Sequence, residues 1–207
     1  MRIAALLLAA AAALAMPANA ARPAPLPAAI YTDPAPNKLH PARMEVLHIP
    51  SGGVEINGVA YLAAGPGLHP TLVLCHGWPG NEKNLDLAQA VRRAGWNVVT
   101  FNYRGSWGSP GNFRFAQNPE DARAVLAYLR SPAVAAKLGI NTAQMAIAGH
   151  SMGGWVTTLV AGEDDGLLGA GLISAASMGV MRGLDRPGIV KMAAENSETL
   201  AGTSPEI

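Results

Sequence analysis

The stretch MAIAGHSMGGWVTTLV, residues 145–160, decides the fold. Its first four residues form a short apolar run typical of a buried strand, and Gly154–Ala161 has a helical pattern. Between them, Gly149, Ser151 and Gly153 form the motif G-x-S-x-G. A serine on a sharp strand-to-helix turn has an exposed hydroxyl. The stretch therefore predicts an α/β fold and makes Ser151 a candidate nucleophile.

The residues around Ser151 suit that role. Gly149 and Gly153 remove the side chains that would clash with the strand and the helix at a tight turn. The N–H groups at the start of the following helix favour negative charge that develops at the site.

The rest of the chain predicts a mostly parallel, doubly wound sheet. Strands are expected at 44–49, 54–62, 71–75, 97–103 and 168–174, and helices at 85–94 and 120–130. From residue 71 onward strands alternate with helices, which implies βαβ units and a parallel sheet. The first two strands have no helix between them, so they are expected to form an antiparallel N-terminal edge hairpin. Residues 44–174 form the expected core, and 175–207 are expected to begin a lid-like or helical segment.

Composition excludes several classes of function. The formal charge is +1 and the Lys and Arg residues are scattered, which argues against a nucleic-acid partner. The single cysteine, Cys75, ends an apolar run and is expected to be a buried small hydrophobe. No cofactor and no metal are expected.

The N-terminus has the pattern of a targeting segment. Arg2 precedes an apolar run over 3–16, and Ala18-Asn19-Ala20 is a small-x-small cleavage site. The run is too short for a stable membrane span. Residues 1–20 therefore predict a signal peptide and export to the periplasm or the cell exterior. The Pro- and Ala-rich residues 21–43 predict an extended leader.

Two loops follow predicted strands near the candidate nucleophile. The loop LCHGWPGNEKN, residues 74–84, comes one βαβ unit before the strand that leads to Ser151. An oxyanion hole takes one N–H from the residue after the nucleophile, here Met152, and one from such a loop, where Trp78 is the expected donor after Gly77.

The second loop, FNYRGSWGSPGNF, residues 101–113, contains neither phosphate-binding glycine motif. For Arg104 we favour bracing of neighbouring loops over contact with a substrate carboxylate. Trp78 and Trp107 are candidates either for an apolar acyl pocket or for packing.

The motifs HGWPG, NYRGSWGS and GHSMGG, in this order and spacing, resemble the α/β-hydrolase superfamily over about residues 46–174. They are most similar to secreted bacterial serine hydrolases of the dienelactone-hydrolase and prolyl-oligopeptidase-like type. The resemblance implies Ser151 as nucleophile and the Met152 and Trp78 amides as oxyanion hole. It implies that His76 and His150 are motif residues near the site without being the general base.

The general base is missing from the expected place. In this superfamily the order is Ser, then Asp or Glu, then His. All five histidines precede Ser151. Without a base a serine hydroxyl is a weak nucleophile. Three explanations are open: a C-terminally truncated enzyme, which we favour, a degenerate non-catalytic relative, or a triad in which His76 serves as base.

The expected activity is hydrolysis of a small-molecule ester, or of a peptide amide, through an acyl-enzyme on Ser151, and the 207-residue chain by itself is expected to be inactive. An ester is slightly favoured, because nothing in the sequence resembles an added domain that would restrict access to peptides. The alternatives are a serine peptidase of the prolyl-oligopeptidase-like type and a non-catalytic secreted binding domain on the same fold.

Overall fold

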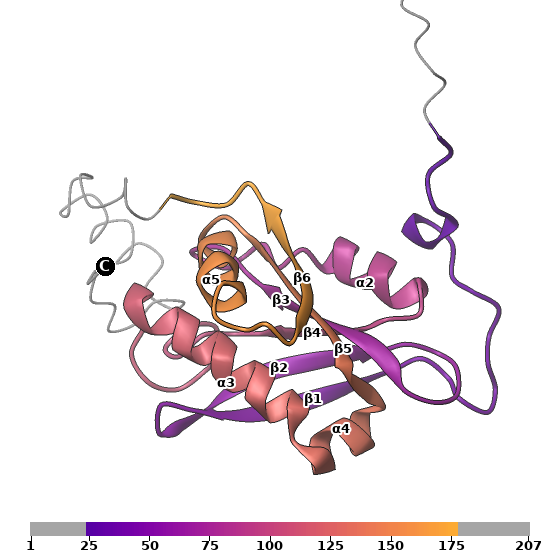
Figure 1. Cartoon of the computed structure of the whole chain (residues 1–207), viewed down its shortest axis with the longest axis horizontal. Coiled ribbons are helices and arrows are strands. Elements are labelled where there is room, and N and C mark those ends of the chain that lie inside the picture. The colour runs from indigo at the N-terminus through magenta and orange to yellow at the C-terminus, as the bar shows by residue number, and fades with distance from the viewer. Residues whose placement is uncertain (1–23, 178–207) are drawn as a thin grey trace, which may run out of the picture.

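The computed structural model describes residues 24–177 and contains one six-stranded sheet with helices on both faces (Figure 1). The strands are β1 (Arg43–Ser51), β2 (Val54–Leu62), β3 (His69–Cys75), β4 (Asn97–Phe101), β5 (Ile140–His150) and β6 (Leu167–Ile173). The helices are η1 (Ala28–Ile30), α2 (Leu85–Arg93), η2 (Phe115–Gln117), α3 (Asn118–Arg130), α4 (Pro132–Leu138) and α5 (Met152–Ala161).

The sheet has the order β1-β2-β4-β3-β5-β6. Strands β4, β3, β5 and β6 are parallel, β1 and β2 form an antiparallel hairpin, and β2 also pairs antiparallel with β4. The predicted fold class, a mostly parallel sheet with an antiparallel N-terminal edge hairpin, is confirmed. The long apolar runs of β3 and β4 are buried, as expected for strands covered on both faces.

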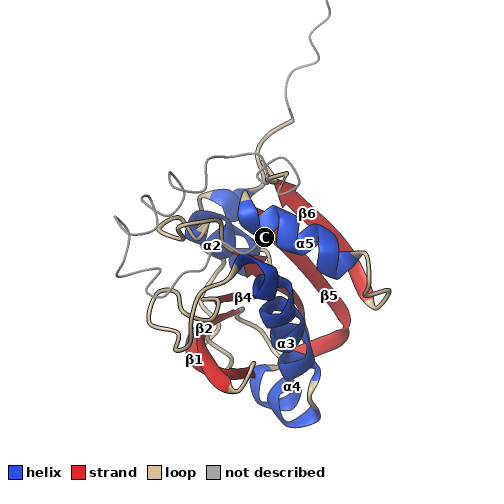
Figure 2. Ribbon diagram, turned by 90° about the vertical axis from the view of Figure 1, so that its left-hand side faces the viewer, coloured by secondary structure: helices blue, strands red, loops and turns tan. Residues whose placement is uncertain are grey.

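Two cores lie on opposite faces of the sheet. One packs side chains of α3 and α5 against β1, β3 and β5, and includes Leu47, Val73 and Val156. The other packs α2 against β2 and β4, and includes Ala88 and Leu74. In Figure 2 the twisted sheet curves around α3. This arrangement brings the carboxyl ends of the parallel strands, where α/β sheets place ligands, to one edge.

The sequence pattern does not predict helix α4, because Pro132 follows the predicted helix at 120–130 as a helix end. The structure instead starts α4 at Pro132, where the missing N–H of proline costs nothing. Ser131 has an extended backbone and separates α3 from α4. Gly139, with φ +64°, ends α4 in the left-handed conformation that glycine tolerates.

The described part of the leader is held against the domain. It contains the single turn η1, and Arg93 on α2 donates hydrogen bonds to the carbonyl oxygens of Ala29 and Ile30 at 2.5 and 2.6 Å. Arg92 pairs with Asp33 at 2.8 Å. The predicted signal peptide and almost all of the predicted lid-like segment lie outside the described residues.

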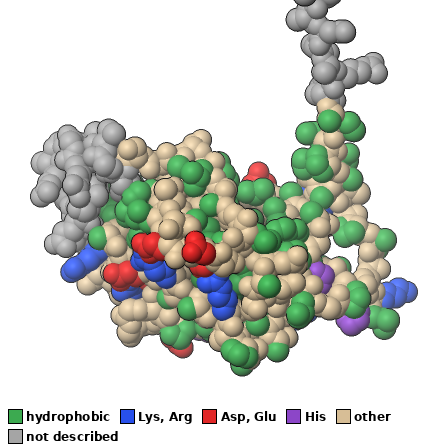
Figure 3. Space-filling view, viewed as in Figure 1, with side chains coloured by type: hydrophobic (Ala, Val, Ile, Leu, Met, Phe, Trp, Pro, Cys, Tyr) green, Lys and Arg blue, Asp and Glu red, His purple; other side chains and the backbone are tan. Residues whose placement is uncertain are grey.

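On the face that carries α3, acidic and basic side chains lie next to one another (Figure 3). Arg123 pairs with Glu163 at 2.6 Å, and Arg130 pairs with Asp164 at 2.6 Å, which ties α3 to the turn after α5. This face therefore has no patch of a single sign of charge. Between residues 24 and 177, no helix is long and apolar enough to cross a membrane.

Candidate active site

Ser151 lies at the tip of the turn between β5 and α5, as the sequence predicts. Its φ of +53° and ψ of −117° are rare for a residue other than glycine. Four hydrogen bonds hold this conformation: the Ser151 N–H donates to the carbonyl of Ile173 at 3.0 Å, and the Ser151 carbonyl accepts from Gly154 at 3.0 Å, Trp155 at 3.3 Å and Ala176 at 2.8 Å. Strand β6 and the residues after it therefore help to fix the turn.

The two motif glycines are required by close contacts between main chains. A Cβ atom on Gly149 would overlap the carbonyl group of Gly153, and one on Gly153 would overlap the carbonyl of Cys75 at the end of β3. The turn at Ser151 thus packs directly against the neighbouring strand end, and only glycine fits at both positions.

The loop after β3 contacts the turn. A Cβ atom on Gly77 would lie 3.2 Å from Ser151 Cβ and 3.2 Å from the His150 carbonyl oxygen. The main-chain N–H groups of Met152 and Trp78 donate no hydrogen bond to any residue between 24 and 177. Neither N–H group is therefore paired within the described part of the chain, and their predicted role in an oxyanion hole stays a prediction.

The side chain of Trp78 packs into the core. Its ring meets Phe115 edge to face with centroids 5.7 Å apart. Its indole Nε1 is buried and has no partner among the described residues. The sequence leaves open whether Trp78 lines an apolar acyl pocket or packs in the core, and the structure shows core packing.

His76 is buried behind the loop. Its Nδ1 lies 2.6 Å from the Gly77 carbonyl oxygen, so it carries the proton, and its Nε2 is buried without a described partner. The ring meets Tyr103 edge to face at 4.7 Å. Burial, with a smaller contribution from Lys83, lowers the pKa of His76 to about 4. The group is a neutral, weak base at neutral pH, which argues against the triad that uses His76.

The hydroxyl of Ser151 makes no hydrogen bond to another described residue. His150 is half-buried, and its Nδ1 also has no described partner. The described part of the chain therefore contains the candidate nucleophile and the two candidate oxyanion donors without a base in contact. It also contains no group of three His, Cys, Asp or Glu side chains that could hold a metal ion.

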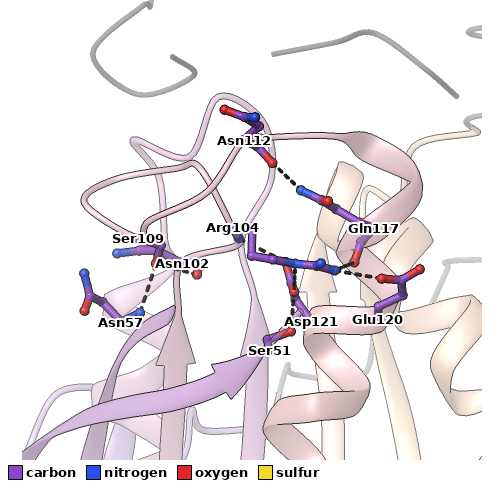
Figure 4. Close-up of polar contacts among 9 residues, drawn as sticks. All are labelled: Ser51, Asn57, Asn102, Arg104, Ser109, Asn112, Gln117, Glu120 and Asp121. Carbon is purple, nitrogen blue, oxygen red and sulfur yellow. Dashed lines mark hydrogen bonds and ion pairs between the residues drawn. The ribbon is translucent and has the colours of Figure 1, made fainter. Parts of the chain in front are cut away.

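Arg104 braces the glycine-rich loop after β4, as we favoured from the sequence (Figure 4). Its Nε donates to Asp121 Oδ1 at 2.5 Å, its main-chain N–H donates to Asp121 Oδ2 at 3.0 Å, and its Nη2 reaches Glu120 at 2.8 Å. Ser51, at the end of β1, donates to the same Asp121 oxygen at 2.5 Å. The network joins three segments and uses the Nε and Nη2 groups of Arg104, whose side chain is largely buried.

Cys75 is fully buried, as predicted, and burial raises the pKa of its thiol to about 12. It is a packing residue directly below the candidate site.

Two contacts near the site were not foreseen. Asn118, at the start of α3, is fully buried and its amide nitrogen lies 3.2 Å from the Met152 sulfur. Trp107 Nε1 donates to the Pro79 carbonyl at 2.8 Å and so joins the loop after β4 to the loop after β3. Both depend on tertiary proximity, for which the sequence pattern carries no signal.

The sheet and the strained serine between strand and helix define an α/β-hydrolase-type domain. A family model described as "Alpha/beta hydrolase family" matches residues 72–204, and the chain belongs to this family.

Solved structures with this fold include a putative dienelactone hydrolase from Klebsiella pneumoniae, with 20% identity and a TM-score of 0.50 over 62% of this chain and 58% of that chain. The alpha/beta hydrolase GrgF from a Penicillium species has 20% identity and a TM-score of 0.56, over 76% and 54% of the two chains. Brefeldin A esterase has 21% identity and a TM-score of 0.51, over 69% and 43%.

Two curated relatives are uncharacterized proteins from two strains of Mycobacterium tuberculosis. Each is 27% identical over 121 residues, which is 58% of this chain and 41% of the relative. The chain thus spans less than half the length of these relatives.

Proposed function

We propose that the protein is a serine hydrolase that cleaves an ester bond through a covalent acyl-enzyme on Ser151. The observation that carries the proposal is the strained Ser151 backbone, φ +53°, held at the start of α5, next to Met152 and the loop of Trp78, whose N–H groups have no acceptor among the described residues. A strained serine with this setting is typical of a nucleophile.

The proposed reaction has two half-steps. A base takes the Ser151 hydroxyl proton as Oγ attacks the substrate carbonyl carbon, and the oxyanion accepts hydrogen bonds from the Met152 and Trp78 N–H groups. The carbon–oxygen bond of the ester then breaks, and the leaving alcohol takes the proton from the base. Water, activated by the same base, attacks the acyl-enzyme and releases the acid and free Ser151.

The base is the missing partner in this scheme. All five histidines precede Ser151, and the best placed of them, His76, is buried with its pKa lowered to about 4. We propose that the catalytic histidine and its acid lie outside these 207 residues. The 207-residue chain alone is then expected to keep only the catalysis that an oxyanion hole and binding supply.

An ester is favoured over an amide. The solved structures that share the fold include proteins named as an esterase and as a dienelactone hydrolase, which supports this choice. A serine peptidase of the prolyl-oligopeptidase-like type is the competing proposal. Comparing hydrolysis of a p-nitrophenyl ester with that of the matching p-nitroanilide separates the two.

A fluorophosphonate probe tests the nucleophile. In a longer protein that includes sequence beyond residue 207, we expect one adduct, located on Ser151 by mass spectrometry, and none in the Ser151→Ala variant. Ser131→Ala, far from the site in the link between α3 and α4, is the matched control and should label like wild type. Equal labelling of wild type and Ser151→Ala would refute the assignment. On the 207-residue chain, brisk labelling would show that a base is already present.

A non-catalytic binding domain on the same fold is the second candidate, and one observation favours it: the Ser151 hydroxyl has no hydrogen-bond partner among the described residues. This candidate predicts no labelling of Ser151 in a protein of any length. Restored labelling in a longer protein would exclude it.

We also propose that residues 1–20 are removed during export. The positively charged start, the apolar run and Ala18-Asn19-Ala20 support this. Mass spectrometry of the secreted or periplasmic protein is expected to find Ala21 at the N-terminus. An intact Met1 on protein recovered from those compartments would contradict the proposal.

A further inference from the structure

A pocket lies next to the end of the loop that follows β3, and Ser151, Met152 and Trp78 do not line it. It has a volume of about 260 Å³ and lies against β1, β2, the end of β4 and the start of α2. Its walls are mainly apolar, with Val46, Val59, Tyr61 and Leu85 among them. Val46 is 68% exposed, so the pocket is open at β1, beyond the part of the sheet that α2 covers.

One cation lines this pocket. Lys83, just before α2, is half-buried, and its Nζ donates to Asn102 Oδ1 at 2.7 Å and lies 5.3 Å from the centre of the Trp107 ring. No carboxylate in the described part of the chain forms an ion pair with it. Every other residue that lines the pocket is uncharged.

The position of Lys83 is set by its surroundings. Asn102, its acceptor, donates from its side chain to the Trp107 carbonyl at 3.0 Å and from its main chain to the Asn57 carbonyl at 2.9 Å. The ammonium group is therefore held at the polar end of an apolar pocket. Burial lowers the pKa of Lys83, as expected for a cation that lacks a counter-ion.

A half-buried cation without an acid is costly, and an anionic ligand removes that cost. A single cation beside apolar walls suits a ligand with one negative charge and an apolar body. We propose that this pocket binds a small aliphatic carboxylate, whose carboxylate pairs with Lys83 Nζ and whose chain lies along Val46, Val59 and Tyr61.

Calorimetric titration with octanoate and with its uncharged analogue octanamide tests the proposal. The protein carries Ser151→Ala, so the result is independent of whether the proposed hydrolase activity is correct. We expect octanoate to bind at least about tenfold more tightly than octanamide, which corresponds to about 1.4 kcal/mol. Equal affinities, or no binding of octanoate, would overturn the proposal.

Two variants locate the site. Lys83→Met keeps most of the side-chain volume and should reduce the preference for octanoate to less than about twofold, whereas Lys38→Met, at an exposed position in the leader, should leave it unchanged. Val46→Asp, on the exposed side of β1, keeps Lys83. It should weaken the binding of octanoate by about tenfold, because the new carboxylate repels the ligand's carboxylate and makes the wall of the pocket more polar. Thermal unfolding checks that each variant is folded. A preference for octanoate that survives both Lys83→Met and Val46→Asp would place binding elsewhere and refute this pocket.

Discussion

At the scale of single residues, the turn at Ser151 depends on two glycines that face other main chains. A Cβ atom on Gly149 would overlap the Gly153 carbonyl group, which is fixed at the start of α5. We expect Gly149→Ala to lower the free energy of unfolding by at least about 2 kcal/mol, because neither main chain can yield without moving the helix. Urea unfolding measures this.

Gly169→Ala is the control for that substitution. Gly169 lies in β6, and a Cβ atom there would have no atom within 4 Å. Its effect should stay within about 0.5 kcal/mol. If the two variants lose equal stability, the steric explanation for Gly149 is wrong.

His76 gives the fold a defined response to acid. Its pKa is lowered to about 4 in the folded protein from an ordinary value of 6.5, because the ring is buried. Between these two values the unfolded chain binds a proton that the folded protein does not. The free energy of unfolding therefore falls as the pH falls from about 6.5 toward 4, by about 2 kcal/mol at pH 5 relative to pH 7.

The measurement is urea unfolding at a series of pH values. His76→Gln should remove most of this slope, whatever it does to stability at pH 7, whereas His48→Gln, at an exposed position on β1, should keep it. A slope that is unchanged in His76→Gln would show that other groups cause the acid sensitivity.

At the scale of elements, the pair of Arg104 and Asp121 joins the loop after β4 to α3. Asp121 is fully buried and takes hydrogen bonds from Ser51 as well as from Arg104. Burial raises the pKa of Asp121, although its partners favour the charged form. Asp121→Asn removes the buried charge opposite Arg104, and we expect a loss of about 3 kcal/mol in the free energy of unfolding.

Glu120→Gln is the matched control, because Glu120 pairs with the same guanidinium from a side chain that is 63% exposed. Exposed pairs are worth about 1 kcal/mol or less. Chemical denaturation should therefore show a much larger loss in the free energy of unfolding for Asp121→Asn than for Glu120→Gln. Similar losses would mean that the buried contact is no stronger than a surface ion pair.

The elements differ in how far the sequence predicts them. The bounds of β2 match the predicted 54–62, and the turn at Gly52 and Gly53 marks the start of the strand. Strand β5 begins at Ile140, five residues before the apolar run, and residues 141–144, which are mostly exposed, extend it without an apolar pattern. Helix α4 is short and follows α3 directly, so the sequence pattern shows only one helix end. Predictions fail here where an element is short or lacks a periodic pattern of buried side chains.

The same division holds for the site. The turn at Ser151 and the two candidate amide donors follow from local motif spacing, so the sequence predicts their place on the fold. The roles of Asp121, Asn118 and Lys83 depend on contacts 17, 34 and 19 residues away along the chain, and no local pattern encodes them.

At the scale of the whole molecule, the described sheet ends in an apolar edge at β6. Within residues 24–177 this strand pairs only with β5, and Leu168 and Leu172 are 57% and 53% exposed. An exposed apolar edge strand offers unpaired main-chain groups to a second molecule.

We expect the 207-residue chain to self-associate through β6, and Leu172→Lys to slow that association several-fold because charge on an edge strand opposes pairing. Light scattering during incubation measures the rate, and the free energy of unfolding should change by no more than about 0.5 kcal/mol. Leu159→Lys, at a 40% exposed position on α5, adds the same charge away from the edge and should have a smaller effect. If both variants slow association equally, net charge rather than the β6 edge controls it.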